Sequence, residues 1–435
     1  MDREEMKQAV CREIDNRKSE MVEVARTILQ TPELGFKEVK TSALVKERYK
    51  GLGLPIREGL AITGVEGMLR CKEDGPTVLV MGELDSVMGR EAPGSDPITG
   101  AAHLCGHHIQ VASMLGTAMG FVGAGVAESL SGKVKFLGAP AEEYIEIEYR
   151  LNLRAQNKLT FLGGKQELIK RGYFDDVDMA MMVHAFPNAP DPAFYLGGRG
   201  NGFLAKFIEY LGKAAHAGAA PHEGINALNA ACLGIIAIHA QRETFQDQDA
   251  IRVHPIITKG GDIVNVVPSE VRLETYVRGR TIEAILDASR KVDRALRAGG
   301  DAVGARTSIT NVPGYLPILQ DETLTQIACA NGRALLGEKG DLDAGFMGGS
   351  FDVGDLSHLI PVLHPFVGGT RGSIHTLDFT IVDYEAAVVL PAKLMAMCVV
   401  DLLADGAREA KRVKEKFQPR LTKKQYLELM QQLIE

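Results

Sequence analysis

The sequence lacks several features that define large classes of proteins. Its 435 residues contain no tryptophan, no internal repeat and no low-complexity segment. Acidic residues outnumber basic ones by 56 to 49, and the net charge of −7 argues against a nucleic-acid-binding protein. No run of about eighteen uncharged apolar residues is present, so a membrane span is not expected. The charged segment Met1–Lys7 predicts no secretory signal, and we therefore expect a cytoplasmic protein.

Cysteine is scarce and scattered. The six cysteines form no Cys-x-x-Cys pair, which argues against a disulfide framework and against a zinc finger; they are Cys11, Cys71, Cys105, Cys232, Cys329 and Cys398. We expect five of them to be small buried hydrophobic residues. Cys105 is the exception, because it stands in a histidine-rich segment.

The composition that remains, 45% hydrophobic and 24% charged, is typical of globular proteins, and the length suggests two or three domains. The first fifty residues are predicted as two helices joined at residues 32–36. Further along, apolar runs at residues 76–81, 134–137 and 179–183 alternate with helical patterns. Because these runs show no polar alternation, they predict parallel strands buried on both faces. We therefore predict an α/β fold with a mostly parallel sheet.

The pattern changes near residue 197. From there to residue 312, strands and helices follow in the order β-α-β-β-α-β, which is typical of a ferredoxin-like α+β module. We predict two domains: a larger one formed by residues 1–196 and 313–435, and a smaller one inserted at residues 197–312. The charged tail from residue 407 is expected to be a solvated helical extension, with a contact to another subunit as the alternative.

Polar side chains follow the three predicted parallel strands, where ligands bind in open sheets. Glu83 and Asp85 follow the first, Glu142 and Glu143 the second, and His184 the third. Each residue alone has an ordinary structural explanation. Together with a cysteine and further histidines, however, they form a ligand set for a transition metal such as Zn²⁺ or Mn²⁺.

The segment His103–His108 supplies the cysteine and histidines. It begins a predicted helix, and glycine at position 106 would let Cys105 and His107 turn toward one point. The hypothesis of a metal site depends on these residues occurring together with the strand-end groups.

Several segments of the chain resemble the M20 metallopeptidases, in the order in which that family carries them. They are Pro32-Glu33-Leu34-Gly35-Phe36-Lys37-Glu38, His103-Leu104-Cys105-Gly106-His107, Pro140-Ala141-Glu142-Glu143, His184-Ala185-Phe186-Pro187, Gly212-Lys213-Ala214-Ala215-His216-Ala217, Asn265-Val266-Val267-Pro268, Asp352-Val353-Gly354-Asp355-Leu356-Ser357 and His375-Thr376. The Cys-Gly-His form resembles the amidohydrolase branch, which includes aminoacylases, auxin-conjugate hydrolases and p-aminobenzoyl-glutamate hydrolase.

This resemblance implies a catalytic domain with two divalent transition-metal ions at the carboxyl edge of the sheet. Mn²⁺ or Zn²⁺ is expected, and Co²⁺ or Ni²⁺ also suits such ligands. Glu142 is implied to be the general base, and Asp85 to orient a ligand histidine. The implied ligands are Cys105 as the bridge between the ions, together with His107, Glu143, His184 and His375.

The resemblance also implies that the inserted domain is a lid and dimerisation domain. His216 would polarise the scissile carbonyl, reaching in from the partner subunit in dimeric members. Asn265 and Arg278 match positions that bind a substrate carboxylate. The expected partners are therefore a small molecule with a carboxylate and further copies of the chain, in a homodimer or a higher homo-oligomer.

Two departures from the family pattern lie beside these residues. His108 replaces an acidic residue, and is either an additional substrate contact or a harmless substitution behind the ligands. Residues 144–162 form an insertion directly after Glu143, where they either shape the pocket or pack structurally.

The implied function is a dimetal hydrolase that cleaves a C–N amide bond in an N-acyl or N-aroyl amino acid, with Glu142 as the base. The alternative is an aminohydrolase that removes an aromatic amino group as ammonia, as a nitroanthranilate aminohydrolase does. A scaffold protein on an inactive M20 frame is disfavoured because neither the base nor a ligand is lost. A single-zinc peptidase is disfavoured because the ligand set is too large for one ion.

Overall fold

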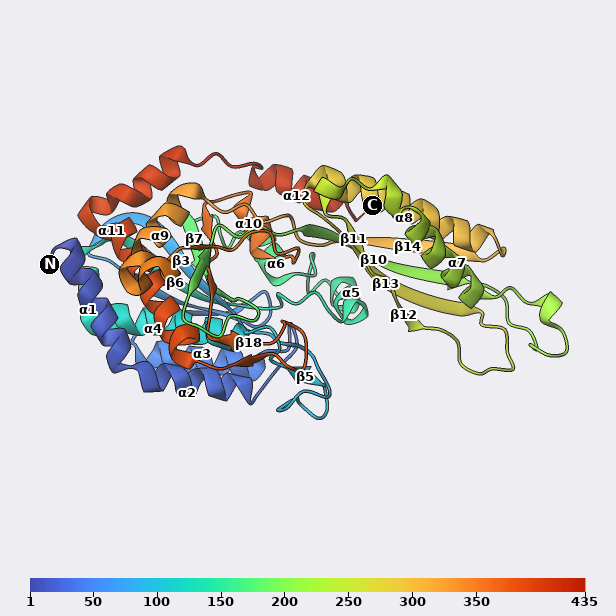
Figure 1. Cartoon of the computed structure of the whole chain (residues 1–435), viewed down its shortest axis with the longest axis horizontal. Helices are drawn as coiled ribbons and strands as arrows, with labels where there is room; N and C mark the ends of the chain where they lie inside the picture. The colour runs from blue at the N-terminus through green and yellow to red at the C-terminus, as the bar shows by residue number, and fades with distance from the viewer. Residues whose placement is uncertain (435) are drawn as a thin grey trace. The chain divides into compact units, whose positions relative to one another are not determined.

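The computed structural model describes residues 1–434, which group into two compact units (Figure 1). Unit 1 comprises Met1–Arg199, Leu319–Met347 and Leu356–Leu421. Unit 2 comprises Gly200–Ile318, Gly348–Asp355 and the described residues from Thr422 onward. The domain limits expected from the sequence stay a prediction; this grouping differs from them by a few residues at both ends of the insert, and more strongly at 348–355 and at the C-terminus.

Unit 1 is built around a six-stranded sheet with the order β1 (Ile56–Leu60), β2 (Gly64–Arg70), β6 (Ser131–Ala139), β3 (Glu73–Glu83), β7 (Met179–Met182) and β16 (Val362–Leu363). β6, β3, β7 and β16 run parallel, whereas β1 and β2 form an antiparallel edge. The apolar run 78–81 of β3 is fully buried, as expected of a parallel strand covered on both faces.

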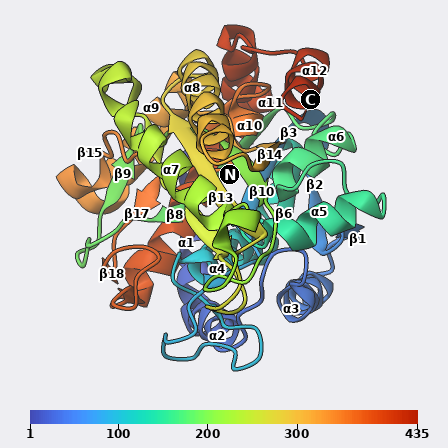
Figure 2. The same cartoon turned by 90° about the vertical axis from the view of Figure 1, so that its right-hand side faces the viewer.

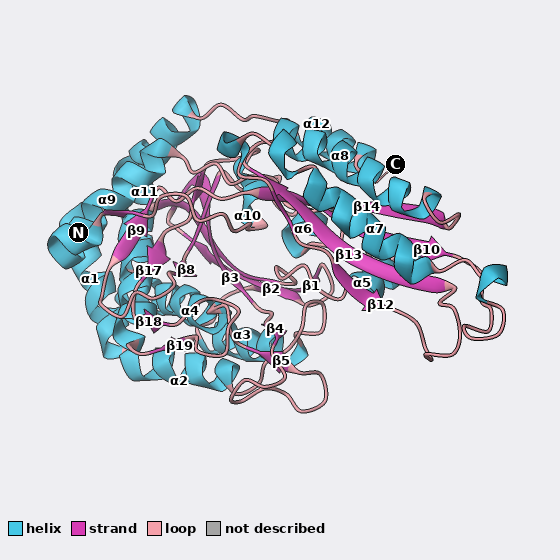
Figure 3. Cartoon of the chain, turned by 45° about the vertical axis from the view of Figure 1, so that its right-hand side comes forward, coloured by secondary structure: helices cyan, strands magenta, loops and turns pink. Residues whose placement is uncertain are grey.

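Helices pack around the strands of unit 1 (Figure 3). Both α4 (His107–Ala124) and α11 (Leu390–Lys416) contact β3. The helical stretch Glu385–Lys416 is long and apolar enough to cross a membrane, but 89% of its most apolar window is buried inside the protein, as in a core helix. The other helices of this unit are α1 (Arg3–Asn16), α2 (Lys18–Leu29), α3 (Val39–Gly51), α5 (Ile147–Ala155), α6 (Gly164–Lys170) and α9 (Glu322–Leu336).

The remaining strands are short. They are β4 (Val87–Met88), β5 (Ala101–Ala102), β8 (His184–Ala185), β9 (Phe194–Leu196), β15 (Leu342–Asp343), β17 (Phe366–Val367), β18 (Thr370–Arg371) and β19 (Thr380–Ile381). β8 begins directly after β7, so His184 stands where that strand of the main sheet ends. One further short helix, α10, spans Val353–Ser357.

The N-terminal region contains three helices rather than the two expected. The first expected helix is divided between α1 and α2 at Arg17, whose φ of −102° and ψ of 10° leave the helical region. Neither proline nor glycine marks this position, so the sequence carries no breaker signal there.

Unit 2 contains an antiparallel sheet with the order β11 (Arg252–Val253), β13 (Glu270–Gly279), β10 (Gly202–Leu211) and β14 (Arg306–Pro313), and β12 (Ile256–Lys259) pairs with β13. The helices α7 (Ala227–Ala240) and α8 (Ile282–Asp301) pack side by side and contact this sheet (Figure 2). Burial alternates along β13, because one of its faces meets the helices and the other does not. The predicted ferredoxin-like fold of this unit is confirmed, and the element order differs from the prediction only by the additional short strand β11.

The C-terminal tail is not the solvated extension expected. Ala407, Ala410 and Val413 at the end of α11 are fully buried in the core of unit 1. Helix α12 (Lys423–Gln432) buries one face within unit 2, where the hydroxyl of Tyr426 donates to Asp355 Oδ1 at 2.7 Å. The many lysines and arginines between these apolar residues made the sequence pattern resemble that of a solvated helix.

The expectation for the five other cysteines is only partly correct. Cys398 is buried, and Cys11, Cys71 and Cys329 are half-buried. Cys232 is exposed, because it lies on the side of α7 that does not contact the sheet. All six cysteines are free.

Candidate metal centre and active site

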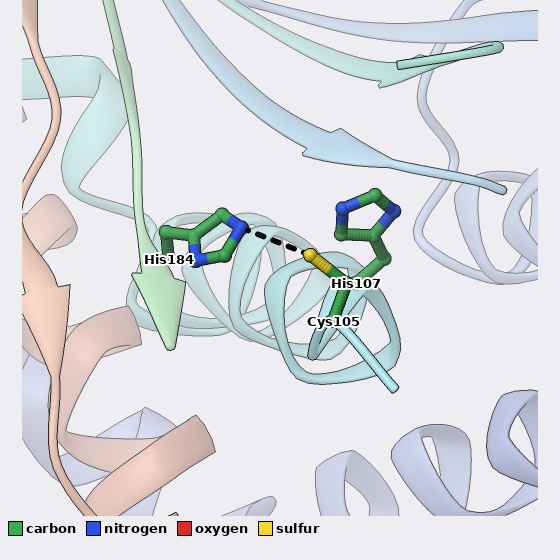
Figure 4. A group of neighbouring side chains, drawn as sticks. All are labelled: Cys105, His107 and His184. Atoms are coloured by element: carbon green, nitrogen blue, oxygen red, sulfur yellow. Dashed lines mark hydrogen bonds between the residues drawn. The ribbon is translucent and has the colours of Figure 1, made fainter. Parts of the chain in front are cut away.

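The turn into α4 brings Cys105 and His107 to one point. Gly106 has a φ of 90°, and a Cβ atom there would lie 2.8 Å from the Cβ of Ala185, so no larger residue fits. Figure 4 shows the thiol of Cys105 between the imidazoles of His107 and His184. The distance from Cys105 Sγ to His184 Nε2 is 3.5 Å.

Two groups of ligand-capable side chains share Cys105. One group is Cys105, His107 and His184, and the other is Cys105, Glu143 and His375. In each group, one donor atom from every residue lies within 4.8 Å of the others. Sulfur, imidazole nitrogen and carboxylate oxygen together form a donor set that fits Zn²⁺ or Mn²⁺, and a thiolate common to both groups fits a pair of ions.

The charges of these residues favour the metal-binding forms of the thiol and the carboxylate, whereas a protonated histidine must release its proton when a metal ion binds. Burial and the Glu143 carboxylate raise the pKa of the Cys105 thiol, but the imidazoles of His107, His375 and His184 outweigh them and lower it to about 6. Burial also raises the pKa of Glu143, yet the His375 imidazole, 2.9 Å away, lowers it to about 2. Burial lowers the pKa of His375, but the charges of Glu143 and Cys105 raise it to about 11. Thiolate and carboxylate are therefore present at neutral pH.

Hydrogen bonds orient the two buried histidines. The Nδ1 of His107 lies 2.9 Å from the backbone oxygen and 3.3 Å from Oδ1 of Asp85, so this nitrogen carries the proton. The Nδ1 of His184 likewise lies 2.9 Å from the backbone oxygen of Ala185. In both rings Nε2 is therefore the nitrogen available to a metal ion.

The two adjacent glutamates follow the end of β6. Glu142 and Glu143 are only 5% and 7% exposed. Glu142 Oε2 lies 3.7 Å from His107 Nε2, and Glu142 belongs to neither group that contains Cys105. With Glu83 and His107 it forms a third group able to hold a metal ion. Its position beside the two groups that share Cys105 suits a base, and this third group makes it a candidate ligand as well.

A buried ion pair lies beside His107, and only one of its two residues is marked by the sequence pattern. Lys165 Nζ lies 2.7 Å from Glu83 Oε1, and both side chains are almost fully buried. Gln110 Nε2 donates to Glu83 Oε2 at 2.9 Å, and His107 Nε2 lies 3.2 Å from the same oxygen. Burial raises the pKa of Glu83, but Lys165 and His107 lower it well below its usual range. The end of β3 pointed to Glu83, whereas no local signal pointed to Lys165.

His108 lies in the interior next to another histidine. Its side chain is 1% exposed, and the ring centroids of His108 and His103 are 5.3 Å apart. Burial lowers the pKa of His108 to about 3, so the ring is neutral at neutral pH. Its predicted contact with substrate stays a prediction.

Unit 2 carries His216, Asn265 and Arg278. The Nδ1 of His216 accepts hydrogen bonds from the backbone N–H groups of Gly218 and Ala219 at 3.1 and 3.0 Å, which places the proton of the neutral ring on Nε2. His216 and Asn265 are both exposed and lie near each other, since the N–H of Ala217 donates to the backbone oxygen of Asn265 at 2.9 Å.

Arg278 is half-buried on β13. It donates to Ser350 Oγ at 2.7 Å, and its guanidinium lies 5.3 Å from the ring centroids of Phe203 and Tyr276. Its side chain is thus held by a hydroxyl and two aromatic rings of the same unit.

Comparison with known proteins shows the family to which the chain belongs. A model of the peptidase dimerisation domain matches residues 201–302. The Xaa-Arg dipeptidase of Mus musculus is 30% identical over 342 residues, which cover 76% of this chain and 74% of that protein. The N-acetylcysteine deacetylase of Bacillus subtilis is 27% identical over 402 residues, or 88% and 97% of the two chains. The chain belongs to the M20 family.

As an M20 member, the protein is a hydrolase that acts on C–N bonds, which confirms the predicted enzyme class. A dinuclear metal-binding M20 peptidase from Bacillus subtilis has the same fold, with a TM-score of 0.65, 22% identity and coverage of 89% of this chain and 99% of its own. The aminobenzoyl-glutamate utilization protein from Klebsiella pneumoniae gives a TM-score of 0.66 at 18% identity, covering 89% and 97%. The predicted fold class is confirmed.

We expect removal of metal from this M20 enzyme to abolish turnover, because a chelator withdraws the Lewis acid while Glu142 stays in place. Metal analysis after reconstitution with Mn²⁺ or Zn²⁺ should find two equivalents per chain and a return of activity. About one equivalent would contradict a dinuclear centre, and fewer than one would favour an inactive scaffold.

Proposed function

We propose that this M20 enzyme is a dimetal hydrolase that cleaves the amide bond of a small carboxylate-bearing substrate, such as an N-acyl or N-aroyl amino acid. The observation that carries the proposal is the pair of ligand groups that share Cys105, with the Glu142 carboxylate beside them. The names of its relatives support it, since they include a dipeptidase and a deacetylase of an N-acyl amino acid.

The residues that would hold the two ions are Cys105, shared by both, together with His107 and His184 on one side and Glu143 and His375 on the other. When bound, the ions supply Lewis acidity that lowers the pKa of water toward neutrality. Asp85 orients His107 through its Nδ1, and the same carboxylate accepts a hydrogen bond from the N–H of Glu143 at 2.9 Å. One aspartate therefore positions a ligand on each side of the centre.

Glu142 takes the proton of the attacking water and later delivers it to the leaving nitrogen. Its neighbour Glu143 contacts His375 and would be a metal ligand, so the two adjacent carboxylates have different tasks. His216 donates from Nε2 to the oxyanion that develops on the scissile carbonyl. The backbone amides that occupy its Nδ1 prepare the ring for this role.

Asn265 and Arg278 are proposed to bind the substrate carboxylate. The guanidinium of Arg278 suits a carboxylate because it offers several donors in one plane. We also propose a homodimer, which the match to a peptidase dimerisation domain supports.

The proposal is tested with purified protein and two substrate panels, one of N-acyl and N-aroyl amino acids and one of aminobenzoates. We expect release of an amino acid from the first panel. Release of ammonia from an aminobenzoate, with no amino acid from the first panel, would replace the amidase by an aromatic aminohydrolase.

We expect His216→Ala to lower kcat by about 10²–10³-fold, the usual effect of losing one oxyanion donor. His222→Ala, an exposed histidine in the same region of unit 2, is the matched control. A mixed dimer of His216→Ala and Glu142→Gln subunits should regain activity if His216 acts on the partner's centre. Absence of any recovery would place His216 in the centre of its own subunit.

A further inference from the structure

The backbone around Glu142 adopts a conformation that needs external support. Ala141, the residue before the proposed base, has a φ of 53°, which is unusual for a residue with a side chain. Ala141, Glu142 and Glu143 lie in a loop between β6 and α5, and not in a regular element that would hold them. Neighbouring side chains must therefore keep this segment in place.

Two buried carboxylates hold the N–H groups on either side of Glu142. Glu38 Oε1 accepts from the N–H of Ala141 at 2.7 Å, and Asp85 Oδ2 accepts from the N–H of Glu143 at 2.9 Å. Both carboxylates are fully buried. The hydroxyl of Thr63 donates to the second oxygen of Glu38 at 2.6 Å and fixes that side chain in turn.

Arg150 holds the carbonyl groups of the same segment. Its guanidinium donates to the backbone oxygen of Glu143, to that of Leu162 at 2.7 Å and, more weakly, to that of Ala141 at 3.5 Å. The side chain is 1% exposed, and among residues 1–434 it forms no ion pair with a carboxylate. The rings of Phe36 and Tyr144 flank the guanidinium, with centroids 5.2 and 5.7 Å away. Burying a charge costs free energy, and here hydrogen bonds to backbone carbonyls offset part of that cost.

Gly35 provides the space for this guanidinium. A Cβ atom at position 35 would collide with Nη2 of Arg150 and would lie 3.0 Å from the Cα of Ala141. Arg150 itself comes from α5, within the insertion that follows the glutamates. The insertion therefore reaches back to the segment that carries the base.

We propose that Arg150 and Glu38 are positioning residues that clamp the backbone of Ala141, Glu142 and Glu143 and thereby aim the Glu142 carboxylate. This inference rests on the proposed role of Glu142 as the base. It assigns to residues 144–162 a task in catalysis that goes beyond structural packing.

Amide hydrogen exchange tests the clamp without any substrate. In Arg150→Met and in Gly35→Ala, the N–H groups of Ala141 and Glu143 should exchange at least about tenfold faster, while those of α4 and of unit 2 keep the wild-type rates. Arg154→Met on the same helix is the matched control and should leave all of these rates unchanged. Unchanged exchange at Ala141 and Glu143 in both variants would overturn the proposal.

Kinetics then separate positioning from other roles. Arg150→Met should lower kcat by about 10–100-fold, as for other supporting residues behind an active site, with KM within about threefold and two metal ions retained. Arg150→Lys should recover part of kcat, and added guanidinium should partly rescue Arg150→Ala. Loss of metal in step with kcat, or a loss confined to KM, would overturn the positioning role. A wild-type enzyme that is inactive on amides would reject the proposed function but would leave the exchange result standing.

Discussion

Glu142→Gln is expected to lower kcat by about 10²–10⁴-fold while both metal ions stay bound, which is the range for a lost general base. The amide keeps the size of the side chain but cannot take a proton from water. Glu142 lies outside both groups that share Cys105 but forms a third metal-capable group with Glu83 and His107, so metal content decides whether it acts as base or ligand; as the base, it should leave both ions bound when changed to Gln. Steady-state kinetics and metal analysis on the same preparation make the measurement.

Glu143→Gln is the matched control for this prediction. It removes the carboxylate that lies 2.9 Å from His375, and should therefore lower metal content as well as the rate. If Glu142→Gln loses metal and Glu143→Gln retains it, the two roles are reversed.

Cys105→Ala is expected to abolish activity through the metal centre. The thiol is the one side chain that belongs to both ligand groups, so its removal weakens both ions together. Losing an outer-shell partner costs about 10–100-fold in metal affinity, and losing a shared ligand should cost more. Titration with Zn²⁺ or Mn²⁺ measures the affinity, and the thiolate-to-metal absorption of a Co²⁺-loaded enzyme should disappear.

Two variants test the specificity of this effect. Cys398→Ser changes another buried free cysteine that belongs to neither ligand group, and should keep both ions. Cys105→Asp replaces the thiolate by a carboxylate, which can also bind metal ions, and should retain more metal than Cys105→Ala. Full metal content and full activity in Cys105→Ala would contradict a shared thiolate.

The strands and the turn that bear the centre could be predicted from local sequence. The apolar runs at 76–81, 134–137 and 179–183 need burial on both faces, and this requirement places their carboxyl ends at one edge of a parallel sheet. Gly106 allows a left-handed turn that directs two donors to one point. Such local signals were absent at Arg17 and along the buried face of α12. There the predicted single helix and the predicted solvated tail differed from the structure.

The partners of the buried charges could not be predicted in this way. Glu83 and Lys165 are 82 residues apart, and Glu38 and Ala141 are 103 apart. Such pairs form because a buried charge or a buried backbone N–H needs a hydrogen-bond partner inside the fold. The local sequence does not indicate which distant residue that partner is. Arg150 is the clearest case, because the sequence placed it only in an insertion that either shapes the pocket or packs structurally.

The sequence by itself determined the α/β class, the inserted ferredoxin-like order, the M20 resemblance and the set of residues able to bind metal. Each of these depends on residue type and on spacing along the chain. Only the tertiary structure decided which atoms face one another: the nitrogen of each histidine left available, and the side chains that hold the backbone beside Glu142. These depend on packing between distant segments, where desolvation makes every unmet hydrogen bond costly and so selects one arrangement.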